Sequence, residues 1–141
     1  MHRFVYAVAM VGQPNGDYLI TCRDLPEVIT DGETRQAALE ATEGALQAAI
    51  EFRIQDNDVI PLPSPAELGE VPVSVPISTA LKAALYLSMR EQGISKAELA
   101  RLLGVDEKEA RRMLDPRHST KVPTLEKALH LLGKQAQLSI V

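Results

Sequence analysis

Residues 95–115 of this chain, SKAELARLLGVDEKEARRMLD, carry its strongest structural signal. Ser95 and Asp106 each precede a glutamate by three residues, which is the capping-box spacing at the start of a helix. Gly104 favours a tight turn between the two helices that these boxes predict. Two short helices joined in this way predict a helix-turn-helix, in which the second helix enters the major groove of DNA.

The polar side of the second helix favours DNA binding over an ordinary helical bundle, which can also contain a helix pair with a glycine turn. Five apolar residues are expected to lock the two helices together: Leu99, Leu103, Val105, Ala110 and Met113. The charged residues then face outward, where Lys and Arg can contact phosphates and Arg can bind guanine. The expected DNA-binding residues are Lys96, Glu107, Lys108, Arg111, Arg112, Arg117, His118 and Lys121.

The helix pair lies inside a longer helical segment. One helix is expected over residues 78–92, and another is expected to start at Pro123, because proline is tolerated at the first helical position. Residues 138–141 (LSIV) are mostly apolar and predict a short terminal strand. A strand edge without a partner is a liability, so we expect this strand to pair with a second copy in a dimer or tetramer.

Upstream, apolar runs separated by turn residues predict three strands and a helix. Residues 4–11 suit a strand buried on both faces, and the Asn-Gly pair that follows predicts a hairpin to a second strand over residues 18–22. A third strand is expected at residues 28–30. Thr34 can cap a helix running to about residue 53, in which Gly44 is expected to permit a close backbone approach.

Proline marks the connection between the two halves. Five of the nine prolines fall between residues 61 and 76, which predicts an extended segment, and residues 71–75 alternate like an edge strand. The expected domains are therefore 1–76 and 77–141. The fold class is α+β, with a β-β-β-α-β domain followed by an all-α helix-turn-helix domain.

Charge divides the chain at the same place. The first 70 residues contain four basic and twelve acidic side chains, a net charge of −8, whereas the remainder carries +4 of the overall −4. A basic half suits nucleic acid, and an acidic half suits a basic protein partner. The alternative is that the charges only keep two surfaces soluble.

Several classes of function are disfavoured. The one cysteine, Cys22, lies in an apolar run, so we expect a buried thiol and neither a disulfide nor a thiolate metal site. Asp17, Asp24 and Asp31 fall at expected turns, which argues against a metal-dependent nuclease. We expect no catalytic residue, metal or cofactor. No signal peptide or membrane-spanning run is seen, which predicts a cytoplasmic protein.

Taken as a whole, the chain resembles the HicB antitoxins. The resemblance is carried by residues 24–27 (DLPE), 30–34 (TDGET), 56–65 (DNDVIPLPSP), 71–75 (VPVSV), Lys121 and 132–134 (LGK). It implies an N-terminal domain with a partial ribonuclease H fold and no catalysis. That domain would bind and neutralise HicA, a small basic toxin that cleaves mRNA. It also implies a C-terminal domain that represses the operon encoding the pair; some members have a ribbon-helix-helix there instead.

The loop around the DLPE stretch is the expected toxin contact, because it mixes apolar with acidic side chains. The expected toxin-binding residues are Asp24, Leu25, Glu27, Ile29, Asp31 and Glu33. The sequence leaves open an alternative, a ligand-sensing transcriptional regulator without a toxin partner. That function would need a polar-lined pocket in the first half of the chain.

Overall fold

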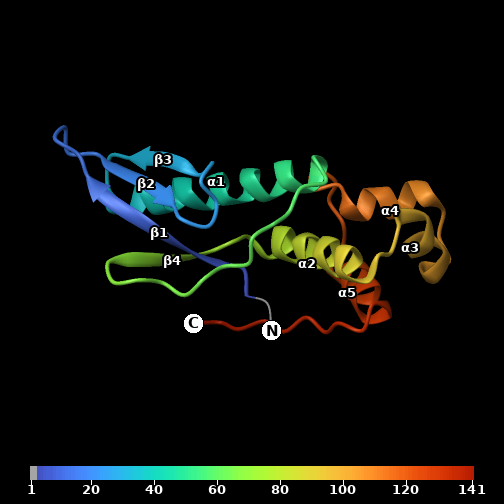
Figure 1. Cartoon of the computed structure of the whole chain (residues 1–141). Coiled ribbons are helices and arrows are strands. Elements are labelled where there is room, and N and C mark those ends of the chain that lie inside the picture. The colour runs from blue at the N-terminus through green and yellow to red at the C-terminus, as the bar shows by residue number, and fades with distance from the viewer. Residues whose placement is uncertain (1–2) are drawn as a thin grey trace.

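The computed structural model describes residues 3–141 and shows a sheet with one helix on it, followed by four more helices (Figure 1). The elements are β1 (Val5–Gly12), β2 (Tyr18–Cys22), β3 (Ile29–Gly32), α1 (Arg35–Gln55), β4 (Glu70–Ser74), α2 (Ile77–Gln92), α3 (Lys96–Leu103), α4 (Glu107–Leu114) and α5 (Val122–Leu131). The expected α+β class and the order of elements in the first half are confirmed.

The four strands form one antiparallel sheet in the order β3-β2-β1-β4. The expectation that β1 is buried on both faces is wrong at its ends. Tyr6 and Val8 are fully buried, but Val5 and Val11 are 38% and 54% exposed. The reason is that α1 covers only one face of the sheet, and on the other face Ala7 is buried whereas Val5 and Val11 are left exposed.

Helix α1 lies on the sheet through the apolar stripe that its sequence predicts. Thr34 caps the helix, because its hydroxyl oxygen accepts a hydrogen bond from the Ala37 amide at 3.0 Å. The buried residues of the stripe are Ala38, Leu46, Ala49, Ile50 and Ile54, with Leu39 and Ala45 partly buried. Together with Tyr6, Val8 and Ile20 of the sheet they make the core of the first half.

The close backbone approach expected at Gly44 occurs instead at Gly32. A Cβ at Gly44 would have no neighbour within 4 Å, because this residue faces solvent. A Cβ at Gly32 would lie 2.3 Å from the backbone nitrogen of Ala38. The end of β3 turns directly into the first turn of α1, and only a glycine fits between them.

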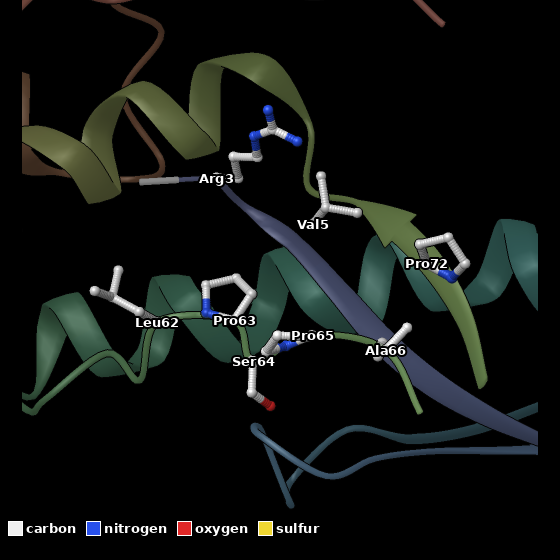
Figure 2. A pocket seen from close by; sticks show the side chains of 9 residues that line it. Arg3, Val5, Leu62, Pro63, Ser64, Pro65, Ala66 and Pro72 are labelled. Carbon is white, nitrogen blue, oxygen red and sulfur yellow. The ribbon is translucent and has the colours of Figure 1, made fainter. Parts of the chain in front are cut away.

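The proline-rich segment is extended, as expected, and is held against the sheet. The Tyr6 hydroxyl donates to the Pro61 carbonyl at 2.7 Å. The Asp24 carboxylate accepts from the Ser64 amide at 2.8 Å, and the Ser64 hydroxyl donates to it as well. Figure 2 shows residues 62–66 running beside β1. These contacts fix the path of the chain from α1 to β4.

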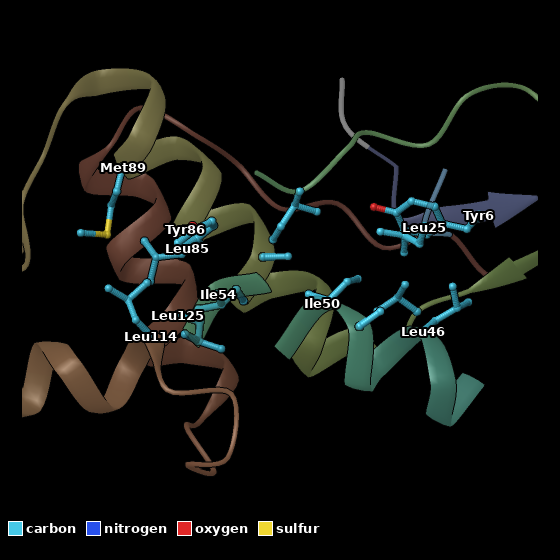
Figure 3. Packing of buried hydrophobic residues seen from close by; sticks show 14 of the residues in the cluster. Tyr6, Leu25, Leu46, Ile50, Ile54, Leu85, Tyr86, Met89, Leu114 and Leu125 are labelled. Atoms are coloured by element: carbon cyan, nitrogen blue, oxygen red, sulfur yellow. The ribbon is translucent and has the colours of Figure 1, made fainter. Parts of the chain in front are cut away.

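The two halves are joined by a buried contact between α1, the residues after it, and α2. The Tyr86 hydroxyl donates to the Asp58 carbonyl at 2.6 Å, and Arg90 donates to the Asn57 carbonyl at 3.0 Å. Ile54 and Tyr86 belong to one continuous cluster that extends from the sheet to α5 (Figure 3). The first half is therefore packed onto the helical half as well as linked to it.

Two expectations for the C-terminal region need correction. Helix α5 starts one residue earlier than predicted, so Pro123 is its second residue, a position that also needs no intrahelical donor. Residues 138–141 are not a strand: they are irregular, and Leu138 and Ile140 are 67% and 83% exposed. They pair with none of the four strands of the described sheet.

Candidate functional sites

Helices α3 and α4 form a rigid pair joined by residues 104–106. The Ser95 hydroxyl accepts from the Glu98 amide at 3.1 Å, and the Asp106 carboxylate accepts from the Glu109 amide at 2.8 Å, so both predicted caps are present. Gly104 adopts a φ of 70°, the left-handed conformation that favours glycine at the end of a helix. Leu99 and Ala110 are fully buried, and Met113 is 1% exposed.

The charged residues of α4 lie on its exposed side. Glu107, Lys108, Arg111 and Arg112 are all exposed, because the buried positions Ala110, Met113 and Leu114 take the opposite face. Arg111 lies 3.6 Å from Glu107, and Arg112 lies 3.5 Å from Glu109. Such exposed pairs within a helix are weak, so the guanidinium groups can exchange these partners for a phosphate or a base.

The loop after α4 adds more exposed basic side chains. Arg117, His118 and Lys121 are exposed, and the loop is ordered by hydrogen bonds back to Asp115. The Arg117 amide donates to the Asp115 carboxylate at 3.0 Å, and the His118 amide donates to the Asp115 carbonyl at 3.0 Å. The exposed basic side chains of α4 are therefore followed by those of Arg117, His118 and Lys121 in this loop.

Lys96, the remaining expected DNA contact, is exposed at the start of α3. It borders a shallow hollow that Arg90 and Leu114 also line. The first-turn amides of α3 make this end of the helix favourable for an anion.

The acidic loop between β2 and β3 is arranged differently from the expectation. Leu25 is 0% exposed and Val28 is 1% exposed, so both belong to the core. Asp24 faces Ser64, and its side chain is only 14% exposed. Leu25 and Val28 are therefore core residues, and Asp24 is held by Ser64 within the fold.

Glu27 is engaged within the chain as well. Its carboxylate accepts two hydrogen bonds from the Arg53 guanidinium, at 2.6 and 3.0 Å. These bonds lower the pKa of Glu27, because they stabilise the charged form. Of the six expected toxin-binding residues, Ile29, Asp31 and Glu33 are exposed and are not engaged in this way. Within the described chain their side chains make no hydrogen bond or ion pair.

The register of the sheet places Ile29 and Asp31 on its open face. Ile29 pairs with Thr21, and Asp31 pairs with Leu19, which in turn pairs with Val11. Paired residues point to the same side, so these side chains share the face opposite α1. Ile29 is 67% exposed and Val11 is 54% exposed. The open face thus combines an apolar area with an acidic edge.

The same face carries a hollow of about 440 Å³ beside the proline-rich segment (Figure 2). Among the described residues that line it, Arg3 is the only charged one, and the others include Val5, Ala7, Pro63 and Pro72. A small polar ligand would find few partners there. This hollow does not have the polar lining that the ligand-sensing alternative requires.

Comparison of the sequence with known proteins shows which family this chain belongs to. A family model described as HicB-like antitoxin of bacterial toxin-antitoxin system matches residues 5–84. The curated protein Antitoxin HicB 1 of Photorhabdus laumondii is 39% identical over 144 residues, covering 99% of this chain and 92% of that protein. Antitoxin HicB of Escherichia coli K12 is 37% identical, covering 96% of this chain and 99% of that protein. The chain belongs to the HicB antitoxin family.

Three residues that organise the first half of this HicB-family chain were not expected from the sequence. Arg23 donates to the Ser64 hydroxyl, to the Pro65 carbonyl at 3.1 Å and to Glu70 at 2.8 Å. Arg53 holds Glu27 and also donates to the Val59 carbonyl at 2.7 Å. Ser64 donates hydrogen bonds from its amide and its hydroxyl to the Asp24 carboxylate. Two of these residues are arginines in an acidic segment, and this charge imbalance could have marked them as internal partners.

The structure also bears on the function classes that the sequence disfavours. Burial raises the pKa of the Cys22 thiol, which donates to the Ala7 carbonyl at 3.6 Å and is an internal packing group, as expected. Among residues 3–141, no group of three His, Cys, Asp or Glu side chains could hold a metal ion. No helix in that range has the length and apolar character needed to cross a membrane.

Proposed function

We propose that this chain binds and neutralises a HicA-type mRNA-cleaving toxin, and that it represses its own operon by binding operator DNA. The proposal is carried by one observation: a chain of the HicB antitoxin family joins an acidic sheet-and-helix half to a basic helical half. The protein would be cytoplasmic and non-enzymatic. The strand and helix order of residues 5–55 supports a partial ribonuclease H-like fold for the toxin-binding half.

Toxin binding is assigned to the open face of the sheet. A partner that binds RNA is expected to be basic, and the −8 charge of the first 70 residues would speed its approach. Affinity needs an apolar centre as well, and Val11, Leu19 and Ile29 supply one beside Asp31 and Glu33. Leu25, Asp24 and Glu27 support this surface through packing and hydrogen bonds within the chain.

Growth rescue tests the toxin assignment. The chain is co-expressed with the product of its neighbouring toxin gene, and Ile29→Arg is expected to abolish both co-purification and rescue. Phe52→Ser is the matched control, because Phe52 is 59% exposed but lies on α1, the helix that covers the other face of the sheet. Loss of rescue by Phe52→Ser, with Ile29→Arg still active, would move the toxin site to the helix.

DNA binding is assigned to the exposed side of α4 and the loop after it. Helices α3 and α4 would act as a helix-turn-helix, with α4 in the major groove. Lys108, Arg111 and Arg112 would face bases and phosphates, Glu107 could accept from cytosine, and the loop residues Arg117, His118 and Lys121 would contact the backbone. Lys96 would contact a phosphate from the start of α3.

Operator titration at several salt concentrations tests the DNA assignment. Arg112→Ala should weaken binding by about 1–3 kcal/mol if the arginine contacts a base. Each phosphate contact should add about −0.9 to the slope of log K against log salt. Lys127→Ala is the control, because Lys127 is equally basic and exposed but lies on α5. Equal losses in the two variants would show only a nonspecific charge effect.

A further inference from the structure

Lys82 is a buried lysine on α2. It is 3% exposed, and it is one of four buried polar or charged residues in the described chain. Burial lowers its pKa, because the charged form is removed from water. A buried ammonium group is costly unless its three donors find acceptors. The position of those acceptors therefore shows what the lysine does.

The acceptors are three backbone carbonyls at and beyond the end of α4. Lys82 Nζ donates to the carbonyl of Arg112 at 3.4 Å and to the carbonyls of Asp115 and His118. Arg112 is in the last turn of the helix, Asp115 caps it, and His118 lies in the following loop. Carbonyls at a helix C-terminus lack helical partners, and a cation is favourable there.

These hydrogen bonds tie the α4 terminus and the loop to a single point on α2. The same loop carries Arg117 and His118, whose side chains are exposed. Their amides are also held by Asp115, at 3.0 Å each. Removing the ammonium would leave the three carbonyls without their shared donor and would free the loop from α2.

We propose that Lys82 is a positioning residue for operator binding, which holds the loop after α4 so that Arg117 and His118 meet the DNA backbone. Lys82 does not itself touch DNA, because it is buried beneath this loop. The inference rests on the proposed DNA-binding function and assigns a role to a residue outside its contact surface.

The test compares Lys82→Met with wild type in the full-length chain. Methionine keeps an unbranched apolar side chain and removes the ammonium group. Operator affinity should fall roughly tenfold or more, equivalent to about 1.4 kcal/mol. The salt slope should become shallower by about 0.9 for each phosphate that the variant no longer binds. Leu87→Ala, a partly buried position on the same helix, controls for lower stability and should retain the wild-type slope.

A double variant separates positioning from general destabilisation. If Lys82 acts through Arg117, then Arg117→Ala should cost little more in the Lys82→Met background, so the two effects on affinity are not additive. Fully additive effects would overturn the proposal. If Lys82→Met does not fold, Lys82→Gln keeps an uncharged amide with two N–H donors and should give an intermediate affinity with the same non-additivity.

A readout without DNA keeps this inference distinct from the proposed function. Hydrogen exchange at the amides of Arg117 and His118 should be faster in Lys82→Met than in wild type or Leu87→Ala. Unchanged exchange would overturn the role of Lys82 whether or not the protein binds DNA. A wild-type chain that binds no operator, with faster exchange in Lys82→Met, would instead refute the proposed function.

Discussion

Gly32 is the glycine at which the sheet and α1 approach each other most closely. The added methyl group of Gly32→Ala would lie 2.3 Å from the Ala38 nitrogen and 2.7 Å from the Ala37 carbonyl carbon. Backbone atoms cannot move aside without displacing the helix, so we expect a loss of stability of about 1–3 kcal/mol or more. Thermal unfolding measures this loss.

Gly44→Ala is the matched control for Gly32→Ala. It lies in α1 with nothing near its Cβ position, and it should raise stability by up to about 1 kcal/mol. A neutral Gly32→Ala would mean that β3 and α1 do not approach as closely as described.

Glu27 gives a residue-scale prediction for pH. Its folded-state pKa is lowered by the Arg53 hydrogen bonds, so its contribution to stability is present above the unfolded pKa of about 4.3 and is lost as the pH falls through the folded value. The side chain is 41% exposed, so this contribution should not exceed about 1 kcal/mol.

Urea unfolding of wild type and Glu27→Gln from pH 7 down to about pH 2.5 measures the effect, because this range spans the titration of the carboxyl group. The two proteins should differ at neutral pH and converge in acid. A difference that persists at the lowest pH would mean that the carboxylate charge is not the cause. Toxin binding by Glu27→Gln should be retained, because this side chain is engaged with Arg53.

At the scale of elements, α3 and α4 have eight residues each and depend on their caps. Asp106→Ala removes the acceptor for the Glu109 amide and should cost about 0.5–2 kcal/mol. Asp106→Asn keeps an oxygen acceptor and should be nearly neutral. Chemical unfolding of the pair of variants checks this, and equal losses would show that the charge at the helix start matters more than the hydrogen bond.

At the scale of the whole molecule, the apolar tail is unpaired within the described chain. Leu138, Ile140 and Val141 are exposed at the end of an irregular segment, which is not part of the sheet among residues 3–141. We still predict that a second copy covers this tail, because the proposed operator binding by a helix-turn-helix would use two half-sites. Deleting residues 138–141 should reduce the sedimentation coefficient and weaken operator binding. A truncated chain that sediments as the same oligomer would exclude this mode of association.

The packing of the two halves against each other is also a property of the whole molecule. Tyr86 and Arg90 of α2 hold the backbone at Asp58 and Asn57, directly after α1. Residues 1–76 alone would lack these partners and expose Ile54. Tests of toxin binding are therefore best made in the full-length chain with single substitutions.

Local patterns in the sequence determined the elements. Caps at Thr34, Ser95 and Asp106, the Asn-Gly hairpin and the α1 stripe each depend on neighbours within a few residues, so periodicity and turn chemistry predict them. The exposed basic side of α4 follows from the same periodicity, which is why the four expected DNA-binding residues of this helix lie at its surface.

Only the tertiary structure decided which acidic-loop residues are free at the surface and which hold the fold. Asp24 meets Ser64 and Glu27 meets Arg53 across 40 and 26 positions of sequence, and Lys82 reaches the end of α4 across more than 30. These pairings depend on how the sheet, the proline-rich segment and the helices pack. Because hydrogen-bonding groups removed from water must find partners wherever packing places them, sequence spacing cannot reveal such pairings.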